Sequence, residues 1–137
     1  MIRFFQEGIS FKLKQPIKTA RWIKSIINKE KFALKELNYI FCSDDYLLSI
    51  NQDFLRHDYY TDIITFDHSS EKRTIEGDIY ISVDRVRENA KEFNSSLDTE
   101  LHRVMIHGVL HLLGYPDKTK AEKMAMRKKE EACLSLR

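Results

Sequence analysis

The chain has 137 residues, 42% of them hydrophobic and 32% charged, which predicts a single globular domain over residues 1–137. Its formal net charge of +2 neither demands nor excludes a polyanionic partner, so any such binding must come from a local patch of cations. Cys42 and Cys133 are too few and too far apart for a disulfide framework, and we interpret both as small core residues. Charged residues between Arg3 and Lys14 interrupt the only apolar run near the N-terminus, so we expect a cytoplasmic protein without signal peptide or membrane span.

Hydrophobic patterning predicts nine elements. Strands are expected at residues 1–6, 37–42, 62–66 and 78–82, where aromatic and branched side chains concentrate. Helices are expected at 16–28, 44–55, 83–93 and 97–113, and a last one begins after Thr119, which forms a capping box with Glu122. This order predicts an α/β (α+β) domain in which about five helices cover a small four-stranded mixed sheet, with the pairing order of the strands left open.

The segment from His107 to Asp117 carries the most specific chemical pattern. His107 and His111 are four residues apart, so they lie on one face of a helix, one turn from each other. Gly114 lets the chain turn back, and Asp117 then returns a third ligand. Two imidazoles and a carboxylate form a known ligand set for catalytic zinc that leaves the fourth position for water. We predict one Zn²⁺ per chain at the end of a central helix, with Mn²⁺ or Mg²⁺ as alternatives because carboxylate is a harder ligand than imidazole.

A helical wheel places Glu100 and Arg103 beside the two histidines, in a polar stripe about 80° wide on an otherwise apolar helix. Such a narrow stripe predicts a helix at the centre of the core, with its histidines facing outward through one slot. The alternative is a pair of core histidines satisfied by hydrogen bonds, which the spacing and the returning aspartate disfavour. His102 falls on another side of the wheel and is left out of the site.

Gly108 stands where zinc peptidases carry the glutamate that acts as general base. A glycine inside a helix costs about 0.5–1 kcal/mol relative to alanine, so we expect a strand or a substrate to approach the backbone here. Without the glutamate, peptide hydrolysis is disfavoured. A phosphodiester is less demanding, because a metal ion lowers the pKa of its bound water to about 7 and neutralises phosphate charge.

The other polar residues that stand out are two aspartates, one histidine and a basic run. Asp62 and Asp78 begin strands and are expected to fix turns by accepting hydrogen bonds from backbone amides, with the lesser alternative that they reach the cleft of the metal site. His68 lies in a polar loop and is expected to be solvated. The basic run on the last helix is typical of a solvated face, but Lys118 and Lys120 directly follow Asp117. These two lysines are therefore our candidates for contacting a phosphate backbone.

Three segments in the same order resemble the YbeY family of rRNA maturation factors, which are described as metal-dependent endoribonucleases. They are I-N-Q-D-F through T-D-I-I-T-F, E-G-D-I-Y-I-S, and the H-G-V-L-H-L-L-G-Y pattern with the ligand after it, together covering residues 50–117. The resemblance implies that the first two metal ligands of the family fall on His107 and His111. The third, a histidine in the family, falls on Asp117.

The resemblance also implies a function. It predicts a single-strand-directed, zinc-dependent endoribonuclease in rRNA maturation (16S rRNA 3′ end processing) and in ribosome assembly or quality control. The catalytic group would be water on the metal held by His107, His111 and Asp117, which either attacks phosphorus or activates a ribose 2′-OH. The implied partners are ribosomal RNA and the ribosome, with ribosomal proteins or assembly GTPases as further candidates, and no membrane.

The residues that would contact RNA are less well specified. The arginine that the family uses in handling RNA falls on Leu55 and its lysine on His57, while Arg56 is one place along and either replaces the arginine or points elsewhere. The predicted RNA contacts are Arg56, His57, Arg103, Lys118 and Lys120. Two alternatives remain: a non-catalytic ribosome-assembly factor braced by the metal, and a metallohydrolase acting on another substrate, such as a peptide.

Overall fold

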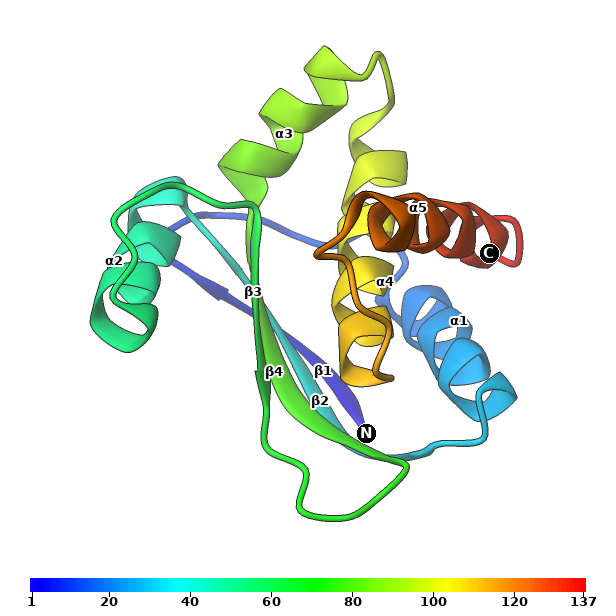
Figure 1. Cartoon of the computed structure of the whole chain (residues 1–137). Helices are drawn as coiled ribbons and strands as arrows, with labels where there is room; N and C mark the ends of the chain where they lie inside the picture. Colours follow the sequence, from blue (N-terminus) through cyan, green and yellow to red (C-terminus); the bar gives the residue numbers. More distant parts are fainter.

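A computed structural model describes all residues from 1 to 137 (Figure 1). The elements are β1 (Ile2–Glu7), α1 (Pro16–Lys29), β2 (Ala33–Cys42), α2 (Asp44–Leu55), β3 (Ile63–Asp67), β4 (Thr74–Ser82), α3 (Val83–Glu92), α4 (Leu97–Leu112) and α5 (Lys120–Leu134). Side-chain caps begin four of the helices: Ser43, Ser82, Ser96 and Thr119 each accept a hydrogen bond from a backbone amide three residues on. The predicted α+β class is confirmed.

The four strands form one sheet in the order β1-β2-β4-β3. β1 pairs with β2 and β2 with β4 in parallel, while β3 pairs with β4 antiparallel, so the sheet is mixed as predicted. Alternation along the strands separates two faces, because successive side chains point to opposite sides of a sheet. On β2, Leu37, Tyr39 and Phe41 enter the larger core, while Cys42 enters a smaller cluster with Leu47 of α2.

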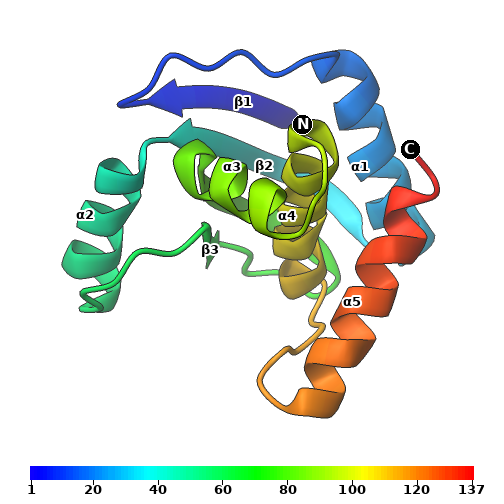
Figure 2. The same cartoon turned by 90° about the horizontal axis from the view of Figure 1, so that it is seen from above.

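α4 lies at the centre of the larger core. α1 and α4 cover one face of the sheet, α5 packs against them, and α2 lies on the other face (Figures 1 and 2). Nine of the 16 residues of α4 are buried, and the Tyr39 hydroxyl donates to the Met105 carbonyl at 2.9 Å, which ties α4 to the sheet. The indole of Trp22 donates to the Cys133 carbonyl at 2.9 Å and joins α1 to α5. The prediction of a central helix is confirmed.

Two strands begin four residues earlier than predicted. β2 starts at Ala33 instead of residue 37, and β4 at Thr74 instead of residue 78, and these two residues pair with each other. The added segments carry charged side chains, and Lys35 Nζ lies 3.7 Å from Glu76 Oε1 across the strands. The backbones of β2 and β4 thus pair beyond their apolar runs, and charged side chains of the added residues lie at the surface.

Neither cysteine forms a disulfide. Cys42 and Cys133 are free and buried, which confirms their interpretation as core residues. No helix combines the length and apolarity needed to cross a membrane.

Candidate metal centre

His107 and His111 lie one turn apart on α4, and their rings meet edge to face with centroids 4.6 Å apart. Their Nε2 atoms are 3.0 Å apart, and Asp117 Oδ2 lies 3.2 Å from that of His111 and 3.4 Å from that of His107. A tetrahedral zinc ion with bonds of about 2.0–2.2 Å keeps its ligand atoms about 3.3–3.6 Å apart. The three donor atoms therefore form a triangle close to the size that zinc requires. These residues fit a metal ion, as the sequence predicts.

The turn after α4 brings Asp117 back to the helix. Gly114 has φ +102°, a left-handed conformation that favours glycine, and its N–H donates to the His111 carbonyl at 3.0 Å. The N–H of Tyr115 donates to the Leu110 carbonyl, also at 3.0 Å. These bonds satisfy the last carbonyls of α4 while reversing the chain, as the position of Gly114 in the sequence suggests.

Tyr115 fastens this turn to two other helices. Its hydroxyl donates to Oε1 of Glu30, the residue that caps the C-terminus of α1, at 2.6 Å, and Lys129 Nζ of α5 lies 3.0 Å from the same oxygen. The hydrogen bond from Tyr115, with help from Lys129, lowers the pKa of Glu30. Tyr115, two residues before Asp117, is thus held in place through Glu30 at the end of α1 and Lys129 of α5.

Glu130 of α5 is the main site residue that the sequence reading missed. It is 5% exposed, and its Oε2 lies 2.6 Å from His107 Nδ1. A carboxylate at Nδ1 holds the proton there and leaves Nε2 free to bind a metal, the usual arrangement behind a metal-bound histidine. The signal was present in the sequence, because Glu130 interrupts the buried stripe of Met126, Cys133 and Leu134.

The electrostatics of His107 reflect this partner. Burial disfavours the charged imidazole, but the hydrogen bond and charge of Glu130, with the charge of Asp117, outweigh burial and raise the pKa of His107. Arg103 balances the carboxylates behind the histidine. Its guanidinium lies 2.6 Å from Glu131 Oε1 and 3.5 Å from Glu130 Oε1.

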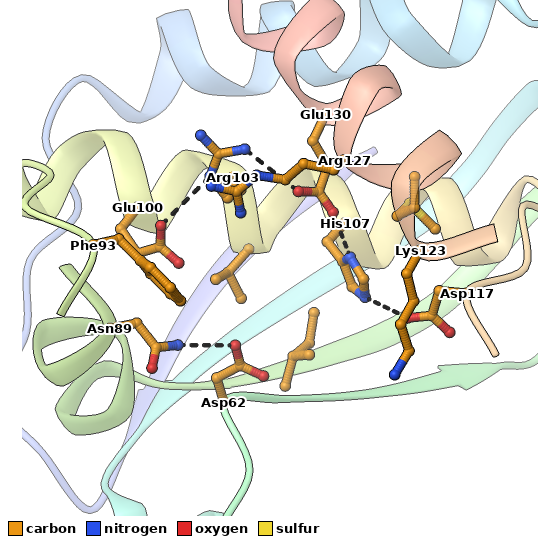
Figure 3. Close-up of a pocket in the computed structure, with 13 residues that line it drawn as sticks. Asp62, Asn89, Phe93, Glu100, Arg103, His107, Asp117, Lys123, Arg127 and Glu130 are labelled. Atoms are coloured by element: carbon orange, nitrogen blue, oxygen red, sulfur yellow. Dashed lines mark hydrogen bonds and ion pairs between the residues drawn. The ribbon is translucent and has the colours of Figure 1, made fainter. Parts of the chain in front are cut away.

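Two cavities meet at the candidate metal triad of His107, His111 and Asp117. The first, of about 370 Å³, lies among α3, α4 and α5 and is called the α3–α5 cavity (Figure 3); Asn89, Phe93, Glu100, Lys123 and Arg127 help to line it. The second, of about 580 Å³, is called the β3 cleft, and Asn51, Leu55, His57, Tyr59 and Thr65 help to line it. Asp62, Ile63, His107 and Asp117 line both. The triad therefore sits where an extended ligand could pass from one hollow to the other.

The family model described as Endoribonuclease YbeY matches residues 3–136. The chain belongs to the Endoribonuclease YbeY family. A protein of that name from Cytophaga hutchinsonii is 58% identical over 136 residues, which cover 99% of this chain and 95% of the relative. Another from Flavobacterium psychrophilum is 50% identical over 136 residues, covering 99% and 96%. A solution structure of a Thermotoga maritima protein aligns with TM-score 0.73 and 32% identity over 99% of this chain and 88% of that one.

The RNA contacts predicted from the resemblance to the YbeY family differ in where they lie relative to the two cavities. His57 lines the β3 cleft, where its ring stacks on Tyr59 at 5.2 Å between centroids. Arg56 caps the C-terminus of α2 in a left-handed conformation and lines neither cavity. Arg103 lines the α3–α5 cavity, but only 11% of its side chain is exposed and carboxylates surround it.

The lysines nearest Asp117 in sequence lie outside the linings of both cavities. Lys118 and Lys120 are exposed, whereas Lys123 and Arg127 line the α3–α5 cavity. The reason is helical: α5 begins at Lys120, and the residues that face α4 recur along it at spacings of three and four. Nearness in sequence was therefore a poor guide to nearness in space on this helix.

The two strand aspartates have different roles in this member of the YbeY family. Asp78 lies in the middle of β4, where its carboxylate accepts a hydrogen bond from the Asn38 side chain and pairs with His68 at 3.0 Å, so its role is structural but the expected bonds to backbone amides of a turn are not formed. His68 is exposed as expected, and its ring also forms this pair. Asp62 instead lines both cavities, accepts a hydrogen bond from Asn89 at 3.1 Å, and has its pKa raised by burial.

Gly108 accommodates the sheet. A Cβ there would lie 2.8 Å from Ile79 Cδ1 and 3.0 Å from Ile63 Cδ1, on β4 and β3. Of the two explanations for this glycine, close approach of a strand is therefore correct. A glutamate at this position would meet the sheet, so the peptidase base has no room in this member of the YbeY family.

Proposed function

We propose that this chain is a zinc-dependent endoribonuclease that cleaves single-stranded RNA during rRNA maturation, including 16S rRNA 3′ end processing. The observation that carries the proposal is the triangle of His107, His111 and Asp117 at the junction of two cavities. Membership of a family named for endoribonuclease activity supplies the substrate class. Ribosomal RNA and the ribosome, in the cytoplasm, would be its partners, with ribosomal proteins or assembly GTPases as further candidates.

His107, His111 and Asp117 would hold one metal ion. Zinc is favoured because two of the three donors are imidazoles, and the carboxylate leaves Mn²⁺ or Mg²⁺ as alternatives. When bound, such an ion supplies a Lewis acid for the phosphoryl oxygens and lowers the pKa of water to about 7. Glu130 keeps the His107 ring in one orientation, so the donor atoms need little rearrangement.

Other residues would bind RNA and move protons. Lys123 is exposed beside Asp117 at the mouth of the α3–α5 cavity, where its charge would attract a phosphate (Figure 3). The stacked pair of His57 and Tyr59 offers an aromatic surface in the β3 cleft for an unpaired base. Asp62 faces both cavities and has a raised pKa, so its carboxylate is our candidate to accept the proton of the attacking hydroxyl.

Metal analysis combined with RNA cleavage tests the proposal. Purified protein should contain about one equivalent of zinc and cut single-stranded RNA, and His111→Ala should lose both metal and cleavage. His68→Ala is the matched control, because it removes an exposed histidine outside both cavities. Cleavage by His111→Ala at the rate of the control would refute the proposal.

Asp117→Ala separates catalysis from the alternative of a metal-braced assembly factor. Asp117 follows the turn between α4 and α5, so a bracing metal would stabilise this corner of the fold. In that case the variant should lose thermal stability and the wild type should cut no RNA. An enzyme should lose cleavage at concentrations and temperatures where the variant is folded by circular dichroism. Cleavage of peptides but not of structured or single-stranded RNA would favour the second alternative, a metallohydrolase that acts on another substrate.

A further inference from the structure

The far end of the α3–α5 cavity is not used by the metal triad. His107 and Asp117 border one end of the cavity, while Asn89, Phe93 and Glu100 border the other (Figure 3). Its volume of about 370 Å³ is within the range of small-molecule pockets, so it can hold a planar ring system beside the metal site. Nothing in the handling of a phosphate requires this extension.

Glu100 is a buried carboxylate with unfilled hydrogen-bonding capacity. It is 3% exposed, and its Oε1 has no hydrogen-bond partner, although Arg103 Nε lies 3.5 Å away and is also without one. Burial raises the pKa of Glu100, with Arg103 opposing it. Buried polar atoms are nearly always paired, so two unpaired atoms on one cavity wall indicate groups that a ligand can complete after a small adjustment.

The other walls suit a nucleobase. Phe93 ends α3 with 54% of its surface exposed, and the guanidinium of Arg127 lies 5.8 Å from its ring centroid. An exposed aromatic ring with a cation beside it is a common platform on which single-stranded nucleic acids stack a base. Asn89 donates its amide to Asp62, which leaves its carbonyl oxygen available as an acceptor.

We propose that the α3–α5 cavity is a nucleobase subsite for a nucleotide flanking the cleaved bond. The base would stack on Phe93 and place an exocyclic amino group against Glu100. Because a carboxylate and an amide oxygen are both acceptors, the cavity favours adenine, cytosine or guanine over uracil, whose N3–H lies between two carbonyls. The inference rests on the proposed RNA cleavage and adds base selection to it.

Single-turnover cleavage of matched RNAs tests base selection. Short single-stranded oligonucleotides would differ at one nucleotide on either side of the cleaved bond, carrying an amino-bearing base, uracil or no base. The wild type should discriminate against uracil and the abasic site at one of these positions by about tenfold or more. Glu100→Gln, whose amide can also donate to a uracil carbonyl, should reduce the discrimination between uracil and the amino-bearing bases to about twofold or less.

Glu131→Gln is the matched control for that variant. Glu131 lies 2.6 Å from the same Arg103 but lines neither cavity, so its substitution should leave the base preference unchanged. A loss of selectivity in Glu100→Gln alone then reports the cavity and not the shared arginine. An unchanged preference in Glu100→Gln, with wild-type cleavage intact, would overturn the subsite and leave the proposed function standing.

Binding gives a second readout that does not require cleavage. Fluorescence anisotropy of the same oligonucleotides on metal-free protein should show about tenfold weaker binding by Phe93→Ala and no change for Phe54→Ala. Phe54 is an exposed phenylalanine outside both cavities. Equal binding of normal and abasic RNA by the wild type would also overturn the subsite. Base-dependent binding that needs Phe93, together with no cleavage of any RNA by the zinc-loaded protein, would support base binding in the cavity and refute the proposed function.

Discussion

Replacing Glu130 by glutamine should weaken metal binding by about tenfold while leaving the protein folded. The carboxylate is 5% exposed and 2.6 Å from His107 Nδ1, so solvent screens their interaction little. A hydrogen bond to a charged group contributes about 1.5–3 kcal/mol and a neutral one about 0.5–1.5 kcal/mol. Glutamine keeps a neutral acceptor for the Nδ1 proton, so the difference of about 1–1.5 kcal/mol corresponds to a factor of about 5–15 in Kd. Glu130→Ala removes the acceptor altogether and should cost about a hundredfold.

Competition with a chromophoric chelator measures the zinc Kd of each variant at pH 7.5, and circular dichroism confirms that each is folded. Glu131→Gln is the control, since the carboxylate of Glu131 also contacts Arg103 but forms no hydrogen bond to either histidine. A Kd for Glu130→Gln within about twofold of the control would refute the role assigned to Glu130, because it would show that the negative charge beside His107 does not strengthen metal binding.

Three further predictions concern the helix, the cavity and the turn. Gly108→Ala should lower the free energy of unfolding by about 1–2 kcal/mol in urea titrations, because the contacts at 2.8 and 3.0 Å outweigh the gain of about 1 kcal/mol in helix propensity; a stabilised variant would contradict the close packing. Asp62→Asn should stabilise the metal-free protein at pH 7 and slow RNA cleavage. Burial raises the folded-state pKa of Asp62 above the ordinary 3.8, so its ionisation destabilises the fold as pH rises through that pKa, and the advantage of the variant should vanish below about pH 3.8; an advantage that persists there would contradict burial as its cause. Tyr115→Phe should lower the free energy of unfolding by about 1.5 kcal/mol, because it loses a hydrogen bond to the charged carboxylate of Glu30, and an unchanged Tm would show that the turn does not depend on this bond.

The elements themselves were largely predictable because local signals specify them. Apolar spacing and the serine and threonine caps located every helix, and the histidine spacing placed two candidate metal ligands on one face of α4. The first four residues of β2 and of β4 were not predicted, because polar side chains such as Lys35 and Glu76 break the apolar pattern although the two backbones pair there. A strand of this kind depends on its neighbour more than on its own sequence.

The sequence by itself determined the ligands of the candidate metal site, because residues within one helix and the turn after it are held by short-range geometry. Only the tertiary structure decided what surrounds that site. Glu130 reaches His107 from a helix 23 residues further on, and Phe93 and Glu100 meet across a cavity that three helices enclose. Contacts between helices depend on how the apolar faces pack against the sheet, and the spacing of residues along one chain segment does not contain that information.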